Sequence, residues 1–336
     1  MGMKFLSGGL LTTVQDAGRF GYQQFGVPVS GAVDPRSLAL ANLLVGNDER
    51  EAALEITLLG PSVEFTASNV IALTGADLSA TLNGAPLARY CAVRVKAGDR
   101  LAFGAPKAGF RAYLAVAGGF ALEPVMGSRS TYLKAKLGGL EGRKLGRDDL
   151  LAFRAPSQAA GGERIEPEDF SGQERTLRVV LGPQDDAFPP QEVRRFFESV
   201  YTVTDQSDRM GSRLDGPAIA HIGDGNIISD GISFGAIQIP ADGKPIVMLA
   251  DRQTTGGYTK IANVITVDLP LIAQSRPGDR IRFVPVGIEE AQRLYLAQRE
   301  RFDRLREQLR PAPTRPGRVF RAWVEGREYL CTVTEC

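Results

Sequence analysis

The sequence predicts a mainly β protein with a few helices, and three observations support this fold class. Most apolar residues fall in short runs rich in β-branched side chains, and these runs end at glycines. Signals for helices are few. A Gly-Asp turn followed by an apolar run occurs at residues 97–103 and again at residues 277–283, with a weaker third copy at residues 146–153. We therefore expect β-barrels and a duplication along the chain.

Three helices are expected. The first begins after Asp34 and Pro35, which supply an N-cap and a proline at the first helical position, and it ends before Gly46. A second is expected after Pro190, as far as residue 200. The third carries an apolar stripe over residues 291–309, which we interpret as a docking face.

Strands and boundaries follow from the same patterns. The clearest strands are expected at residues 70–73, 111–116, 177–181, 246–249 and 261–267. A polar, glycine-rich stretch with little apolar periodicity provides the best internal boundary. The expected parts are an N-terminal β-barrel half (1–156), a linker (157–175), a C-terminal β-barrel half (176–287), and a C-terminal helix and hairpin (288–336).

Composition excludes several classes of function. Forty basic and thirty-nine acidic residues give a net charge of +1, so no field of one sign attracts nucleic acid or an anionic membrane. No segment has the length and apolarity of a signal peptide or membrane span, so a cytoplasmic protein is expected. The only histidine, His221, excludes a multi-histidine metal site and is expected to be an ordinary packed residue. Three cysteines without C-x-x-C spacing favour neither disulfides nor zinc.

The segment from Thr12 to Asp34 is the first candidate for chemistry. It contains several glycines and prolines, which a simple connector does not need. The segment offers amide, carboxylate, guanidinium and hydroxyl groups that suit a small polar substrate, on Gln15, Asp16, Arg19, Ser30 and Asp34. The alternative, given equal weight, is that Asp16 pairs with Arg19 and that Asp34 only caps its helix.

A second candidate follows an apolar strand and combines acid, base, amide, hydroxyl and glycine. Its residues are Asp251, Arg252, Gln253, Thr254, Thr255, Gly256, Gly257 and Tyr258. The amides of the glycine pair are suited to an anion-binding nest, although the segment matches neither a Walker loop nor a dinucleotide fingerprint. As a functional surface loop, it is expected to lose activity when Asp251 or Arg252 is replaced by alanine, with little loss of stability.

The third candidate contains two arginines four residues apart. Arg209 and Arg213 are suited to presenting a fork to a carboxylate or phosphoryl oxygen. From the residues alone, surface ion pairs with Asp208 and Asp215 are the favoured alternative.

Taken together, these segments resemble one known family between about Leu10 and Phe283. The pieces that carry the resemblance are residues 14–19 with 21–22, 26–28 with 30–32, 41–42 with 45–47, 54–55 with 60–61, 74–77, 235–240 and, above all, 251–258. The family is variously described as allophanate hydrolase subunit 2, biotin-dependent carboxyltransferase-like, KipI antagonist, and the C subunit of 5-oxoprolinase. One departure is Thr259, where the family commonly has proline.

The resemblance implies tandem cyclophilin-like β-barrel domains. It also implies the C subunit of an ATP-dependent 5-oxoprolinase, which cleaves 5-oxoproline to L-glutamate together with two partners, a KipI-like B subunit, and a LamB-type A subunit. ATP would be used by the complex, and no biotin-attachment segment is present in this chain. Two alternatives remain: a carboxyltransferase component acting on urea or a similar amide, and a regulatory protein that binds a KipI-like kinase inhibitor.

Within this family the residue chemistry suggests a division of roles. Asp16, Asp251 and Arg252 are the catalytic candidates: the carboxylates would position or deprotonate water, and the arginine would stabilise developing charge. No metal is expected. The substrate-binding candidates are Gln15, Arg19, Ser30, Arg209, Arg213, Gln253, Thr254, Thr255, Gly256, Gly257 and Tyr258.

Overall fold

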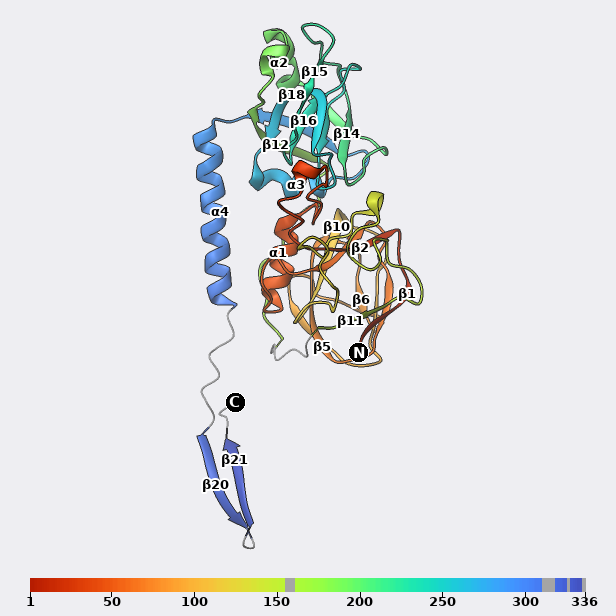
Figure 1. The fold of residues 1–336 in the computed structure, drawn as a ribbon, viewed down its shortest axis with the longest axis vertical. Helices are drawn as coiled ribbons and strands as arrows, with labels where there is room; N and C mark the ends of the chain where they lie inside the picture. Colours follow the sequence, from red (N-terminus) through yellow and green to blue (C-terminus); the bar gives the residue numbers. More distant parts are fainter. Residues whose placement is uncertain (155–160, 310–317, 325–326, 334–336) are drawn as a thin grey trace.

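The computed structural model describes residues 1–154, 161–309, 318–324 and 327–333, and its architecture is mainly β (Figure 1). Residues 1–154, here the N-terminal half, form two antiparallel sheets. In hydrogen-bonding order, the first contains β11 (Leu150–Ala152), β1 (Gly2–Ser7), β4 (Ser62–Phe65), β9 (Arg100–Ala102), β6 (Thr81–Leu82) and β7 (Ala85–Pro86). The second contains β2 (Leu11–Gln15), β3 (Ala53–Thr57), β10 (Ala108–Val116), β5 (Asn69–Asp77) and β8 (Ala92–Val95).

The two sheets enclose one apolar core. Phe5 and Phe65 from the first sheet pack in the same cluster as Ile56 and Leu114 from the second. All of these side chains are fully buried. Burial of this apolar surface is what holds the two sheets face to face.

Residues 174–285, here the C-terminal half, form a barrel. In order, its strands are β12 (Glu174–Leu181), β19 (Arg280–Pro285), β13 (Val200–Val203), β14 (Gly211–Asp215), β17 (Ile246–Met248), β16 (Ala236–Ile239), β18 (Thr255–Val264) and β15 (Asn226–Gly231). The barrel closes because β12 pairs with the later part of β18, at Val179↔Val264. Strand β15 pairs with the earlier part of β18 and extends the sheet beyond the ring.

The expected helices are confirmed, with small changes at their ends. They are α1 (Pro35–Leu44), α2 (Pro190–Glu198) and α4 (Ile288–Gln308). A fourth, short helix that was not expected is α3 (Leu269–Ala273). The 3-10 turns are η1 (Gln23–Phe25), η2 (Leu133–Ala135), η3 (Asp185–Ala187) and η4 (Thr266–Asp268). Asp34 caps α1 by accepting a hydrogen bond from the Ser37 amide at 3.0 Å. The predicted terminal hairpin consists of β20 (Arg318–Val324) and β21 (Arg327–Val333).

Helix α4 runs from the C-terminal barrel alongside α1 of the N-terminal half (Figure 1). Its predicted docking face is confirmed near its end, where Phe302 is buried against Leu40 and Leu43. Nearby, Glu49 pairs with two arginines of the helix, Arg299 at 3.4 Å and Arg306 at 2.8 Å. Within the described residues no helix is both long and apolar enough to cross a membrane.

The predicted strand at residues 261–267 ends early. Strand β18 stops at Val264, and residues 266–268 instead form η4, which leads directly into α3. Pro270 lies in the first turn of α3, where proline favours helix over strand. At its other end β18 begins at Thr255, inside the segment expected to be a loop.

The repeated Gly-Asp turn is a true structural repeat. In two copies the glycine adopts a left-handed conformation, with φ of +91° at Gly98 and +92° at Gly278. The Gly98 amide donates to the backbone carbonyl of Phe65, and the Phe65 amide donates in return to the backbone carbonyl of Asp99. Gly278 and Asp279 make the same two bonds with Val203. In the third copy Asp148 takes the glycine position with φ of +69° and bonds to Phe5 in the same way.

We predict that Gly278→Ala lowers the free energy of unfolding by about 1–2 kcal/mol, because a Cβ atom disfavours the left-handed conformation even where space is open. Urea denaturation measures the change. Gly172→Ala is the matched control, since its backbone is not left-handed and its new Cβ would meet only one atom at 3.7 Å. Equal losses in both variants would contradict the assignment of strain to the turn.

Candidate functional site

A buried ion network joins the two halves of the molecule. Arg209 of the C-terminal half approaches Asp251 with Nε at 2.9 Å from Oδ2 and Nη2 at 3.1 Å from Oδ1. Its Nη1 donates to Glu55 Oε1 on β3 of the N-terminal half. All three side chains are nearly inaccessible, with Glu55 1% and Asp251 5% exposed. Buried charges require such pairing, because an isolated one is strongly destabilising.

The turn at Ser30 and Gly31 completes the surroundings of this network. Ser30 Oγ donates to Asp251 Oδ1 at 2.6 Å, and the Gly31 carbonyl accepts from Arg209 Nη2 at 2.6 Å. Ser30 has φ of +56°, an unusual conformation for a residue other than glycine, and it is held there by buried contacts on both sides. The turn is thus shaped to contact the C-terminal half.

Glu55 is fixed by several donors. Its Oε2 accepts from the Val33 amide at 2.9 Å and from the Tyr113 hydroxyl at 2.7 Å. Burial acts to raise the pKa of Glu55, but the nearby guanidinium groups of Arg209 and Arg111 and these hydrogen bonds outweigh it, so the pKa is lowered. Glu55 therefore stays ionised, and burial raises the pKa of Tyr113 well above its usual value.

Gln274 makes a second polar connection between the halves. Its Oε1 accepts from the amides of Phe110 and Arg111, both at 2.9 Å. Its Nε2 donates to the Arg111 carbonyl and to Asp34 Oδ2, both at 2.8 Å. Asp34 therefore both caps α1 and contacts the C-terminal half, so its role is wider than a cap alone.

Asp16 is saturated by donors from its own half. Its carboxylate accepts from the Gly18 amide at 2.8 Å, the Ser128 hydroxyl at 2.7 Å, the Arg129 amide at 2.6 Å and the Ser130 hydroxyl at 2.5 Å. A carboxylate with this many donors is held in place and is poorly suited to deprotonate water. The sequence analysis did not identify residues 128–131 as the segment that contacts Asp16. The only signal was weak, a run of four polar residues in the sequence.

Arg19 and Gln15 also contact this neighbouring segment, and both are completely buried. Arg19 Nη2 donates to the Ser130 carbonyl at 2.8 Å, and Gln15 Nε2 donates to the Thr131 carbonyl at 3.0 Å. No direct ion pair joins Arg19 to Asp16 in the described ranges, so the expected alternative pairing is not formed. Arg19 Nη1 and Gln15 Oε1 have no hydrogen-bond partner in the described structure. Burial lowers the pKa of Arg19.

Arg252 differs from Arg209, because no carboxylate among the described residues forms an ion pair with it. Its Nε donates to the Ile232 carbonyl at 2.9 Å and its Nη1 to the Leu249 carbonyl at 3.2 Å. The guanidinium also lies 5.5 Å from the ring centre of Phe234. Burial alone lowers the pKa of Arg252 to about 10, so the side chain remains charged at neutral pH. An anionic group would therefore be favoured beside it.

The segment from Asp251 to Tyr258 is only partly a loop. Gly256 and Gly257 lie in β18 without left-handed angles, and Gly256 faces Asp230 of β15. The prediction of an anion-binding nest is therefore wrong, because a nest needs alternating helical and left-handed backbone that a strand lacks. Tyr258 lies on the same strand and is exposed.

A cavity of about 690 Å³ opens beside this segment, a size within the usual range for small-molecule sites. Thr254 and Thr255 line it, together with Ile232, whose carbonyl holds Arg252. The buried Lys260 also lines the cavity and pairs with Asp230 at 2.9 Å. The remaining lining residues are Gln23, Gln24, Val180, Leu181, Gly182, Pro183, Gly231, Ser233, Ala236, Ala262 and Asn263.

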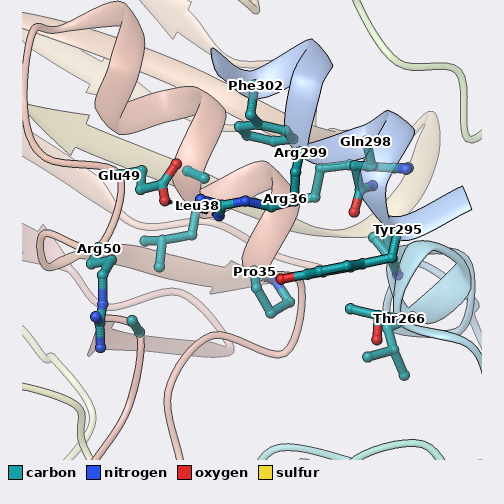
Figure 2. A pocket seen from close by; sticks show the side chains of 14 residues that line it. Pro35, Arg36, Leu38, Glu49, Arg50, Thr266, Tyr295, Gln298, Arg299 and Phe302 are labelled. Carbon is teal, nitrogen blue, oxygen red and sulfur yellow. Dashed lines mark hydrogen bonds and ion pairs between the residues drawn. The ribbon is translucent and has the colours of Figure 1, made fainter. Parts of the chain in front are cut away.

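A smaller cavity of about 210 Å³ lies under α4. Figure 2 shows Tyr295 and Phe302 reaching from α4 toward Pro35 and Leu38 of α1. Its surface is largely apolar, and no residue of the segment from Asp251 to Tyr258 lines it. Asp251 and Arg252 do not line the larger cavity either, but Thr254 and Thr255 of the same segment do. We therefore place the candidate site at the larger cavity. Within the described residues, no group of three histidine, cysteine or acidic side chains is arranged to hold a metal ion.

The remaining predicted residues do not all converge. Arg213 is exposed on β14, whereas Arg209 is buried, so the two do not form the expected fork. Gln253 lies between Arg252 and Thr254 and is partly buried. Thr259, found where the related family commonly has proline, uses its amide to bond with Gly225 and its hydroxyl to bond with His221 Nε2 at 3.1 Å. His221 also packs on a phenylalanine ring, as expected of a structural residue.

Comparison with known proteins places this architecture in context. The family described as "Carboxyltransferase domain, subdomain A and B" matches residues 25–285. The C subunit of 5-oxoprolinase from Escherichia coli (strain K12) is 40% identical over 308 residues, which cover 90% of this chain and 97% of that protein. The protein of the same name from Haemophilus influenzae is 36% identical over 282 residues, which cover 84% and 90%.

The fold is also similar to that of a solved enzyme. The crystal structure of Kluyveromyces lactis urea carboxylase matches with a TM-score of 0.85 and 32% identity. The match covers 95% of this chain but 31% of that enzyme, so the chain spans under a third of the enzyme's length.

We predict that Asp251→Ala lowers the free energy of unfolding by about 3–5 kcal/mol, because it leaves the buried Arg209 with only one of its two carboxylates. This corrects the expectation of a tolerant surface loop. Denaturant unfolding measures the change, and Arg213→Ala, exposed and without a side-chain partner in the described structure, should change stability by less than about 0.5 kcal/mol. A loss below about 1 kcal/mol for Asp251→Ala would count against the network.

Proposed function

Because the chain belongs to the carboxyltransferase domain family, subdomains A and B, we propose that it is the C subunit of an ATP-dependent 5-oxoprolinase. The complex would open the lactam ring of 5-oxoproline to give L-glutamate, with a KipI-like B subunit, and a LamB-type A subunit, as partners. The observation that carries the proposal is the 40% identity to a 5-oxoprolinase C subunit, which extends over nearly the whole of both chains. The enzymatic activity belongs to the complex.

The chemistry of the site suits an anionic amide. 5-Oxoproline carries a carboxylate. Arg252 does not itself line the large cavity, but its Nε is bonded to the carbonyl of the lining residue Ile232, and its charge has no acidic partner in the described ranges. Thr254 and Thr255 add hydroxyl groups on the same wall. A guanidinium is well suited to hold a carboxylate in a defined orientation. We therefore propose Arg252 as the residue that binds the carboxylate, with the two threonines contacting the lactam.

The reaction requires the lactam carbonyl to be activated. ATP would transfer its terminal phosphoryl group to the lactam oxygen and leave as ADP, which makes the ring carbon more electrophilic. Water then adds to that carbon, the bond to nitrogen breaks, the nitrogen takes a proton, and a further water releases phosphate. The buried carboxylates Asp16 and Asp251 are fully engaged by donors, so we assign them to positioning the site.

A second candidate is a carboxyltransferase that acts on urea or a similar amide. The structural similarity to urea carboxylase supports it as a related activity. Urea is neutral and offers no negative charge to Arg252. A carboxylated donor carries a carboxylate that could pair with it. This candidate and the 5-oxoprolinase differ in their substrates and can be distinguished by one assay.

We predict that the chain alone does not turn over 5-oxoproline and that the complex with both partners does so with ATP. The chain and its co-expressed KipI-like partner should also co-elute from gel filtration at micromolar concentration, since stable interfaces bury more than about 1,200 Å². Product formation is followed as glutamate and ADP. Turnover of urea with a carboxybiotin donor instead would favour the second candidate, and a stable pair without either activity would favour the regulatory alternative.

We predict that Arg252→Gln in the assembled complex raises the KM for 5-oxoproline at least about tenfold, because a neutral side chain loses the attraction to the substrate carboxylate. Steady-state kinetics measure KM, and gel filtration confirms assembly. The matched control is Arg213→Gln, an exposed arginine on β14 away from the cavity lining. Unchanged kinetics in the Arg252 variant would remove this residue from the site.

A further inference from the structure

We propose that Glu55 is a positioning residue for the site, which acts through Arg209 on Asp251 and on the cavity wall formed by Thr254 and Thr255. The inference rests on the proposed function, because it is measured by the turnover of the complex. Glu55 forms part of the Leu54-Glu55 motif that carries the family resemblance, but no chemical role follows from the sequence. Its side chain does not line the large cavity.

Glu55 occupies a position that would otherwise be filled by an apolar side chain. It lies in the middle of β3, where all five residues are buried and its neighbours Leu54 and Ile56 are apolar. A carboxylate here costs folding energy that only close partners recover. Replacement of a whole buried ion pair by apolar residues is often neutral for stability, so the presence of both Glu55 and Arg209 points to a role beyond stability.

The contacts form a rigid chain from Glu55 to the candidate site. One carboxylate oxygen is fixed by Val33 and Tyr113, and the other accepts from Arg209 Nη1. A guanidinium is planar and rigid, so fixing Nη1 also fixes Nε and Nη2, which hold both oxygens of Asp251. Asp251 directly precedes Arg252 in the chain. Thr254 and Thr255, which line the cavity, follow three and four residues after Asp251. The position of this cavity wall therefore depends on Glu55.

The charges explain what removing Glu55 would do. The network contains two arginines, Arg209 and Arg111, and two carboxylates, Glu55 and Asp251. Arg111 is 4% exposed, and burial lowers its pKa, with a smaller contribution in the same direction from the charge of Arg209. A neutral side chain at Glu55 leaves Arg209 with Asp251 as its remaining carboxylate, and leaves Arg111 with only the weaker influence of Asp34 among nearby carboxylates. Arg209 would then lose its anchor in the N-terminal half and hold Asp251 less firmly.

The test uses the complete complex of the chain with its two partners, with kcat and KM for 5-oxoproline measured well below the melting temperature. We expect Glu55→Gln to lower kcat at least about tenfold while KM changes less than about threefold. The alignment of the lactam at Thr254 and Thr255 is lost, but Arg252 is held independently by the carbonyls of Ile232 and Leu249 and still contacts the carboxylate. Glu55→Asp keeps the charge and should recover part of the kcat. This second variant also keeps the test meaningful if the glutamine variant does not fold.

Two further measurements separate positioning from general destabilisation. The control is Asp279→Asn, which breaks a comparably buried ion pair with Arg175 at 3.5 Å outside this network and should reduce stability but not kcat. The second is a double-mutant cycle with Arg209→Lys, which keeps a charge but loses the fork. If Glu55 acts through Arg209, adding Glu55→Gln to that variant lowers kcat by less than about twofold further.

Several results would overturn the proposal. Unchanged kcat in Glu55→Gln, an equal loss of kcat in Asp279→Asn, or independent, multiplying effects in the cycle would each show that Glu55 is only structural. Failure of the proposed function is seen separately, because the unmodified complex would then not turn over 5-oxoproline. If that complex instead carboxylates urea, the same variants are compared in that reaction.

Discussion

The structure depends on one buried guanidinium. Arg209 is enclosed between the two halves, and neither half provides all of its partners: Asp251 comes from the C-terminal barrel, whereas Glu55 and the Gly31 carbonyl come from the N-terminal half. A charge in this position is acceptable only when all of these groups are present together. The arrangement of the two halves is therefore specified by a polar contact with strict geometry as well as by apolar packing.

This constraint divides the polar residues of the site into two groups. Arg209, Asp251, Ser30 and Asp16 are buried and fully used in holding the backbone. Arg252 lies directly next to the fixed Asp251, yet its charge has no acidic partner in the described structure. Residues of the first group give the candidate site its shape, and Arg252 is the residue that we propose for binding the substrate.

Much of the fold follows from local sequence signals. Asp34-Pro35 begins α1 in the expected way, and the Gly-Asp turns recur with the same hydrogen bonds because each needs one left-handed residue before a strand. The ends of elements were less predictable. Thr255 to Tyr258 contain a glycine pair that is typical of a loop, but pairing with β15 draws them into a strand.

The sequence by itself determined the fold class and the main helices, because these depend on local periodicity and turn chemistry. It also indicated the segments in which we place the candidate site. It could not determine which polar residues are buried. Arg209 and Arg213 look alike in sequence, yet one is enclosed at the contact between the halves and the other is exposed. Glu55 had no recognisable role for the same reason: its partner is 154 residues away in the chain. Only the tertiary structure brings Arg209 and Glu55 together. This pairing decides which arginines are neutralised by a carboxylate.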